Sequence, residues 1–414
     1  MSLKTGLSIV IVLLTFSGMN AQEIDLLILN RNYQFAIAQI DRMLESGPTA
    51  DLYFKKGLVC EKLMDFDGAV TALQAACTAD STNAIYLEEL AEAWSSLGNH
   101  TDAALCLQRA AGLEPDNLVQ KGKLAQCLIS LKNYQDACSL YSQIYQRDST
   151  NTYHNRYFAY AAYQAGQLDL AVRLYGRLAG QMVRDVQVYL NLAGIYNKQK
   201  KFSQAVTTCM HGLHLFKDHP ALLLKWAEIL FQNKEYGKAQ YPYERYLARN
   251  DSTFEVLKNY GICLYFTRFE EESLRTLDKC YQLTVNDPIV NFYIGACYKK
   301  LKQFPESVDF FKLAIETATP FYLADIYQHL GQVYGLQREF DSSIAAYQEA
   351  LKLDPENAEL LFEIATTYEE IRSSETLALN YYQSYLKQAG EQAKRADYAL
   401  DRIKKLKEEL FFEQ

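Results

Sequence analysis

Proline and tryptophan are scarce in this chain, with 8 prolines and 2 tryptophans among 414 residues. A low proline content is typical of a chain made mostly of helices, because proline breaks a helix interior. Basic residues are also in deficit, since 42 lysines and arginines against 50 aspartates and glutamates leave a net charge of −8. No segment is basic enough to follow a phosphate backbone, so the composition argues against nucleic acid as a partner.

The sequence also lacks the motifs that carry common enzyme chemistry. It contains no glycine-rich loop for phosphates and no G-x-S-x-G nucleophile turn. Metal-ligand residue types gather only at Cys209, His211, His214 and His219. His211 and His214 would be two neutral ligands without a defined carboxylate partner, which makes a weak site. We therefore expect no metal, no cofactor and no enzymatic activity; a weak metal-dependent or enzymatic activity is the alternative from another functional class.

Long apolar runs are missing except at the N-terminus. Lys4 precedes an apolar run over residues 7–16, and small and polar residues follow as far as Ala21. This is the layout of a secretory signal peptide, and the run is short for a membrane span. We predict that residues 1–21 are a signal peptide and that the mature chain begins at Gln22. The protein is then expected to be exported to the periplasm, with secretion or a place at the cell surface as the alternative. An uncleaved membrane anchor is the alternative.

What the chain does have is a strict repeat of small residues. The first series recurs every 34 residues: Gly57, Ala91, Ala125, Ala159, Ala193, Ala227, Gly261 and Gly295. A second series follows twelve residues behind: Ala69, Ala103, Ala137, Ala171, Ala205, Ala239, Ser273 and Ser307. A period of this length indicates a solenoid built by repetition of one supersecondary unit.

Each unit is predicted to be a helical hairpin, as residues 84–117 illustrate. Leu87, Leu90, Ala91 and Trp94 share one helical face, and Ala103, Leu107 and Ala110 share another. The turn lies at Leu97, Gly98 and Asn99, and Pro115 ends the unit. The small residues let the two helices approach closely.

This pattern resembles the tetratricopeptide repeat (TPR), most closely in residues 324–357, which contain Tyr327, Leu330, Gly331, Tyr334, Phe340, Ser343, Tyr347, Ala350 and Pro355. The resemblance implies an all-α, right-handed superhelical solenoid of about ten helical hairpins. We divide the chain into an incomplete first repeat (22–49), eight contiguous repeats (50–321), a further repeat (324–357), a degenerate repeat (358–390) and a C-terminal capping helix (391–414).

The resemblance also implies a binding groove, because in this family the first helices of successive repeats line a concave face that holds a partner peptide or helix. The positions of this sequence that correspond to that face are Tyr153, Arg156, Tyr160, Tyr163, Asn191, Asn197, Lys198, Lys225, Lys258, Asn259, Tyr265 and Phe266. Ordinary surface is the alternative interpretation. Some members clamp a terminal carboxylate with Lys and Asn; here Ile262 stands where the clamp needs Asn, so a chaperone-tail receptor is not expected.

We therefore expect a protein–protein interaction scaffold of the bacterial cell envelope, in assembly or secretion complexes. The ending Asn20-Ala21-Gln22 resembles export signals of Bacteroidetes-type bacteria, and the turns at 80–82, 148–150 and 251–253 resemble their O-glycosylation acceptors. A surface or glycan-associated accessory protein is the alternative. The nine cysteines are expected to be mainly buried free thiols, with a Cys263–Cys280 bridge left open.

Overall fold

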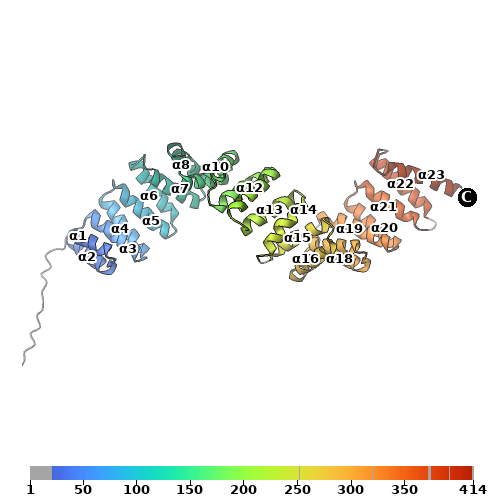
Figure 1. Cartoon of the computed structure of the whole chain (residues 1–414), viewed down its shortest axis with the longest axis horizontal. Coiled ribbons are helices and arrows are strands. Elements are labelled where there is room, and N and C mark those ends of the chain that lie inside the picture. Colours follow the sequence, from blue (N-terminus) through green and yellow to red (C-terminus); the bar gives the residue numbers. More distant parts are fainter. Residues whose placement is uncertain (1–20, 251, 319, 372–373, 391, 413–414) are drawn as a thin grey trace, which may run out of the picture. The chain divides into compact units, whose positions relative to one another are not determined.

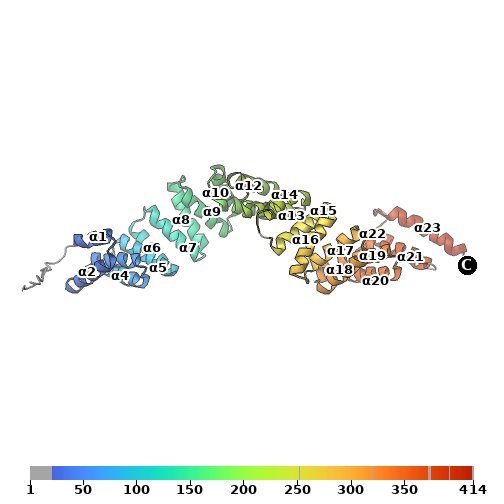
Figure 2. The same ribbon diagram turned by 60° about the horizontal axis from the view of Figure 1, so that its bottom comes forward.

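The computed structural model describes residues 21–250, 252–318, 320–371, 374–390 and 392–412. Residues 1–20 of the predicted signal peptide lie outside this part of the chain. In the described residues every regular element is an α-helix. Consecutive helices from α1 to α10, and again from α12 to α23, pack side by side as antiparallel neighbours (Figures 1 and 2). The all-α repeat fold predicted from the 34-residue period is therefore confirmed. No helix in the described residues has both the length and the apolar character needed to cross a bilayer.

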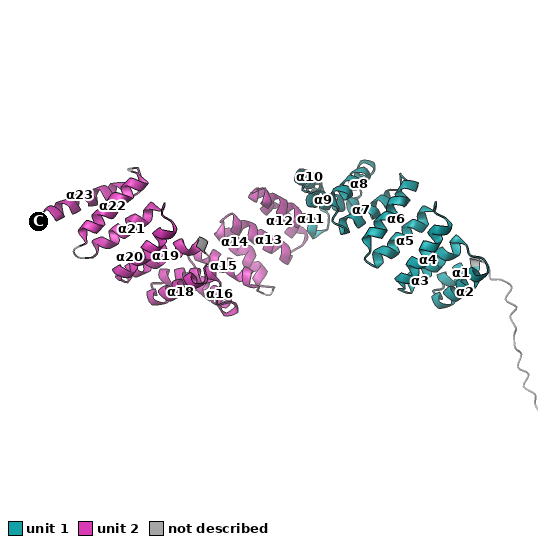
Figure 3. Cartoon of the chain, turned by 180° about the vertical axis from the view of Figure 1, so that it is seen from behind, with its two compact units in different colours: residues 1–188 teal, residues 189–414 magenta. Residues whose placement is uncertain are grey.

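The helices divide between two compact units, residues 1–188 (unit 1) and residues 189–414 (unit 2), which Figure 3 colours separately. Unit 1 contains α1 (Ala21–Leu29), α2 (Tyr33–Ser46), α3 (Ala50–Lys62), α4 (Phe66–Ala79), α5 (Ala84–Ser96), α6 (His100–Leu113), α7 (Leu118–Ser130), α8 (Tyr134–Arg147), α9 (Thr152–Gln164) and α10 (Leu168–Gly180). The boundary between the units falls inside α11 (Val186–Lys198).

Unit 2 continues with α12 (Phe202–Leu215), α13 (Pro220–Gln232), α14 (Tyr236–Leu247), α15 (Phe254–Phe266), α16 (Glu270–Leu283), α17 (Pro288–Lys300), α18 (Phe304–Thr317), α19 (Pro320–Leu336), α20 (Phe340–Leu353), α21 (Ala358–Glu369), α22 (Glu375–Ala389) and α23 (Ala396–Phe412). Odd-numbered helices from α3 to α21 are the first helices of their hairpins. Within unit 2 the first helices α15, α17 and α19 contact one another in series.

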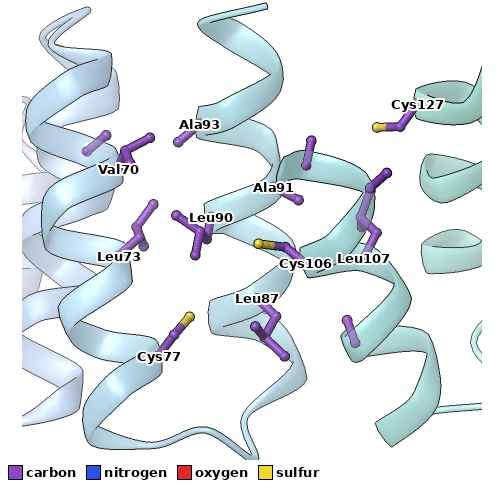
Figure 4. Packing of buried hydrophobic residues seen from close by; sticks show 14 of the residues in the cluster. Val70, Leu73, Cys77, Leu87, Leu90, Ala91, Ala93, Cys106, Leu107 and Cys127 are labelled. Carbon is purple, nitrogen blue, oxygen red and sulfur yellow. The ribbon is translucent and has the colours of Figure 1, made fainter. Parts of the chain in front are cut away.

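The core of unit 1 shows how a hairpin buries its small and bulky residues. Ala91 of α5 and Ala103 of α6 are 1% and 0% exposed, so the two helices meet through side chains that are single methyl groups. Leu87, Leu90 and Leu107 are buried in the same cluster, and Leu90 points toward Leu73 of α4 (Figure 4). The predicted hairpin over residues 84–117 is confirmed in this cluster.

Three hairpins of unit 2 replace the alanine pair with a serine that bonds a glycine. The hydroxyls of Ser273, Ser307 and Ser343 donate to the carbonyl oxygens of Gly261, Gly295 and Gly331 at 2.7, 2.8 and 2.7 Å. All three serines are fully buried. A buried hydroxyl needs such a partner, and the carbonyl twelve residues earlier supplies it without a larger side chain.

In each hairpin from α3–α4 to α19–α20, the turn passes through one residue with a positive φ angle. The series is Met64, Gly98, Lys132, Gly166, Lys200, Lys234, Arg268, Lys302 and Arg338, with φ between 56° and 77°. Residues with a Cβ atom enter this left-handed region at a cost of roughly 1 kcal/mol, which glycine avoids. The packing of the two helices therefore sets the turn geometry even where the residue is not a glycine.

Both ends of the predicted repeat array have identifiable structure. At the N-terminal end α1 and α2 form a hairpin with a short first helix, and Ile24, Ala36 and Ile40 are fully buried in it. At the other end α23 packs on α22 with Ala399 and Leu406 buried. These contacts cover an apolar helix face that the last repeat of a solenoid otherwise exposes.

All nine cysteine thiols are free and buried. Burial raises the pKa of Cys209 and Cys280 to about 12, so these thiols stay protonated and behave as small apolar groups. This outcome confirms the expected free thiols and leaves Cys263 and Cys280 unbridged. Among the described residues no cluster of three His, Cys, Asp or Glu side chains is arranged to hold a metal ion.

Candidate functional site

The first helices of unit 2 border an open cavity of about 340 Å³. Four consecutive first helices, α13, α15, α17 and α19, and the start of α14 contribute its walls. The lining residues are almost all apolar or aromatic: Phe231, Tyr236, Ile262, Pro288, Ile289, Phe292, Tyr293, Tyr322, Asp325 and Ile326. Asp325 is the one carboxylate among them. We call this hollow the aromatic cavity.

Stacked rings hold the walls of the aromatic cavity in place. Tyr236 of α14 lies parallel to Phe266 of α15, with ring centroids 4.3 Å apart and planes at 8°. Tyr293 of α17 meets Tyr265 and Phe266 edge-on at 5.2 and 6.0 Å. Such contacts fix ring orientation beyond what area burial alone gives. Two residues predicted for the groove, Tyr265 and Phe266, thus support this cavity from behind.

A hydrogen-bonded group around one lysine, Lys299, lies next to the wall residue Phe292. The ring of His329 on α19 is 5.1 Å from that of Phe292, and His329 Nδ1 lies 2.9 Å from Lys299 Nζ. Lys299 also donates to Gln332 Oε1 at 2.8 Å. Burial and the charge of Lys300 lower the pKa of Lys299 to about 8, while burial and the charge of Lys299 lower the pKa of His329 to about 4. At neutral pH the imidazole is therefore neutral and accepts from a charged ammonium.

Lys299 and Gln332 also border a second, more polar cavity of about 630 Å³. Its remaining walls come from the end of α19, from α20 and from α21, and include Arg338, Glu363 and Glu370. Glu363 is held by Arg395, whose Nη1 lies 2.7 Å from the carboxylate. We call this hollow the polar cavity.

Three of the four charged residues predicted for the groove form ion pairs with their own neighbours. Arg156 pairs with Asp185, and Lys225 pairs with Glu228 at 3.3 Å. Lys258 pairs with Glu255 at 2.8 Å and approaches Asp287 at 3.5 Å. Burial lowers the pKa of Lys258, but these two carboxylates outweigh it and raise the pKa overall. The charges of these three cations are therefore already compensated by carboxylates of the same chain.

The other predicted positions are spread over both units. In unit 1, Tyr153 is 45% exposed and accepts from Gln126 Nε2 at 2.6 Å, and Tyr160 packs edge-on against Tyr134. In unit 2, Asn197 donates to Gln232 Oε1 at 2.7 Å. The remaining positions lie on first helices, Tyr163 on α9, Asn191 and Lys198 on α11, and Asn259 on α15. Their role in binding stays a prediction.

The residues that line the aromatic cavity were largely missed by the sequence prediction, although its own register contains them. Counted from the start of each repeat, Phe292 and Lys299 occupy the fifth and twelfth positions, which are those of Lys258 and Tyr265 one repeat earlier. Extending the groove positions to the repeats that begin at 288 and 324 identifies Phe292, Tyr293 and Lys299. The signal was therefore present, but the cavity itself depends on side chains from four repeats.

Comparison with known proteins agrees with the repeat assignment. Tetratricopeptide repeat family models match residues 324–357, and residues 22–84 and 65–117. A curated relative, tetratricopeptide repeat protein 8 of Caenorhabditis elegans, is 23% identical over 176 residues, which is 42% of this chain and 35% of that protein. The chain thus matches about a third of the length of that relative.

Solved helical-repeat structures are also similar, at low identity. The structure of Naa15/Naa10 bound to HypK-THB is 14% identical with a TM-score of 0.45. The match covers 93% of this chain and 66% of that chain. YrrB, a TPR protein with an unusual peptide-binding site, is 16% identical with a TM-score of 0.40, over 45% of this chain and 95% of that one. The repeat period, the paired helices and the matching family models lead to one conclusion: residues 22–117 and 324–357 of this chain are tetratricopeptide repeats.

Proposed function

We propose that the protein is a non-enzymatic scaffold that binds an extended segment of a partner protein along the first helices of unit 2. The aromatic cavity is the observation that supports this proposal, because four repeats leave a hollow of about 340 Å³ among rigid rings. This volume is at the lower end of the range of ligand pockets and accommodates a large apolar side chain. The partner segment would insert that side chain into the cavity and lie across neighbouring first helices.

Ile289→Glu tests this use of the cavity. The substitution places a carboxylate in the apolar lining, and Leu283→Glu on α16 is the matched control because Leu283 is 63% exposed and does not line the cavity. Random peptides displayed on phage are selected on the full-length chain and then measured on both variants. We expect peptides with a large apolar residue whose affinity falls at least tenfold on Ile289→Glu and stays within twofold on Leu283→Glu. Equal affinity for all three proteins would remove the cavity as the binding site.

We also propose that the chain is an exported bacterial protein, in a Bacteroidetes-type host, that holds components of a cell-envelope or secretion assembly together. The apolar run and small residues of segment 1–21 support this proposal. Fractionation of the native host, with N-terminal sequencing of the protein, tests it. A mature chain that begins at Gln22 in the periplasmic or surface fraction is expected; a full-length cytoplasmic chain would contradict export.

A further inference from the structure

Lys299 is a half-buried cation whose charge no carboxylate compensates within the described residues. Its ammonium donates to two neutral acceptors, His329 Nδ1 at 2.9 Å and Gln332 Oε1 at 2.8 Å. Neither acceptor carries a negative charge, and one of the three N–H groups of the ammonium remains without a protein acceptor in this part of the chain. A charge held away from water in this way attracts an anion more strongly than a solvated lysine does.

The neighbouring cation shows the usual arrangement. Lys300 lies 3.3 Å from Glu270, donates to the carbonyl oxygen of Tyr265 at 2.9 Å, and places its ammonium 3.7 Å from the centre of the Tyr265 ring. The predicted groove cations Lys225 and Lys258 likewise have carboxylate partners. Lys299 differs from these three lysines in having only neutral partners.

Lys299 borders both the wall of the aromatic cavity and the polar cavity. It contacts His329, which packs on Phe292 of the aromatic cavity, and it lines the polar cavity together with Gln332. The polar cavity also contains Arg338 and the carboxylates of Glu363 and Glu370. Arg395 pairs with Glu363 and also with Glu359, so the negative charge of Glu363 is partly compensated from outside the cavity. The ammonium of Lys299, which has only neutral partners, is the point of this lining that attracts an anionic group.

We infer that Lys299, held in place by His329 and Gln332, binds a carboxylate of the partner segment whose apolar side chain occupies the aromatic cavity. This inference rests on the proposed function and adds the chemistry of the partner to it. Phe292 and Lys299 are seven residues apart on α17, which is about 10 Å along a helix. About three residues of an extended chain cover that distance. The expected ligand is thus an extended segment with an acidic group three to five residues from a large apolar residue.

Synthetic versions of the selected peptides test the inference with two variants. Lys299→Met keeps the length of the side chain and removes its charge; Lys300→Met removes an adjacent charge that Glu270 already compensates. We expect Lys299→Met to weaken acidic peptides about tenfold and Lys300→Met to weaken them less than threefold, since a hydrogen bond to a charged group contributes about 1.5–3 kcal/mol. Replacing the Asp or Glu of a peptide by Asn or Gln should weaken its binding to the wild-type chain about tenfold. The same replacement should not change the affinity of the peptide for Lys299→Met.

The source of the carboxylate is determined by comparing each peptide with its C-terminal amide. Loss of affinity in the amide identifies a terminal carboxylate, and loss only on Asp→Asn or Glu→Gln identifies a side chain; either supports the inference. Peptides that fill the aromatic cavity without any acidic preference would overturn the inference and leave the proposed function standing. Equal weakening of acidic and neutral peptides by Lys299→Met would also overturn it, because that result indicates a structural role. If no peptide is sensitive to Ile289→Glu, both fail.

Discussion

Lys299→Met should also change how the stability of the protein depends on pH. Burial and Lys300 lower the pKa of Lys299 from its ordinary 10.5 to about 8, so the folded state disfavours the charged amine. For a base with a lowered folded pKa, the destabilisation is fully present below pH 8 and disappears as the pH rises towards 10.5. Linkage between these two pKa values gives a destabilisation of about 3 kcal/mol at pH 7 and about 1.4 kcal/mol at pH 9.5.

The variant removes this destabilisation but also the two hydrogen bonds to His329 and Gln332, together contributing about 2 kcal/mol. We therefore expect Lys299→Met to be about 1 kcal/mol more stable than the wild type at pH 7 and slightly less stable at pH 9.5. The change between the two pH values, about 2 kcal/mol, does not depend on the value assigned to the hydrogen bonds.

Urea unfolding followed by circular dichroism at pH 7 and pH 9.5 measures this change as a difference between variant and wild type. Taking the difference removes the titration of the tyrosines, which both proteins share. Lys312→Met on α18 is the control, because its exposed side chain is solvated in the folded and unfolded states alike. If the difference in unfolding free energy between Lys299→Met and the wild type is the same at pH 7 and pH 9.5, the charged ammonium of Lys299 does not destabilise the folded state and the reasoning is refuted.

Three further predictions concern the repeat core. Gly261→Ala should destabilise unit 2 by about 1–3 kcal/mol, because the added methyl group would lie 2.7 Å from Leu277. At Gly194 an added methyl group meets no atom within 4 Å, so Gly194→Ala should stabilise unit 2 by about 1 kcal/mol. Urea unfolding measures both changes. Glu61→Gln should stabilise unit 1 above pH 7 and not at pH 4.5. Burial, and next the charge of Glu89, raise the pKa of Glu61 to about 7, so the folded state disfavours the charged carboxylate at higher pH. Hydrogen exchange of α3 and α5 at pH 5 and 8 checks this, and equal protection of variant and wild type at both pH values would contradict it. Iodoacetamide should modify all nine thiols in denaturant and few of them under native conditions, as mass spectrometry would show; rapid native labelling would contradict their burial.

The sequence alone predicted the hairpins well, because each depends on residues close in the chain. Ala91 and Ala103 are twelve residues apart, and their helices meet as the period indicates. The aromatic cavity was harder to predict because its walls come from Phe231 to Ile326, a span of four repeats. A repeat pattern specifies where a side chain points but not whether neighbouring side chains fill the space between them. The unpaired charge of Lys299 depends likewise on what the next repeat places beside it.

The left-handed turn at the centre of each hairpin has a consequence for proteolysis. Six of the seven turn residues in that series that are not glycine are Lys or Arg, and all six are exposed. Trypsin cleaves after these two residues, and a short exposed turn with an unfavourable backbone angle is a place where the chain opens locally. Brief digestion of the folded protein should therefore release internal fragments of one or two repeats from between the turns at Lys132 and Lys302. The order in which the turns are cut would rank the hairpins by local stability.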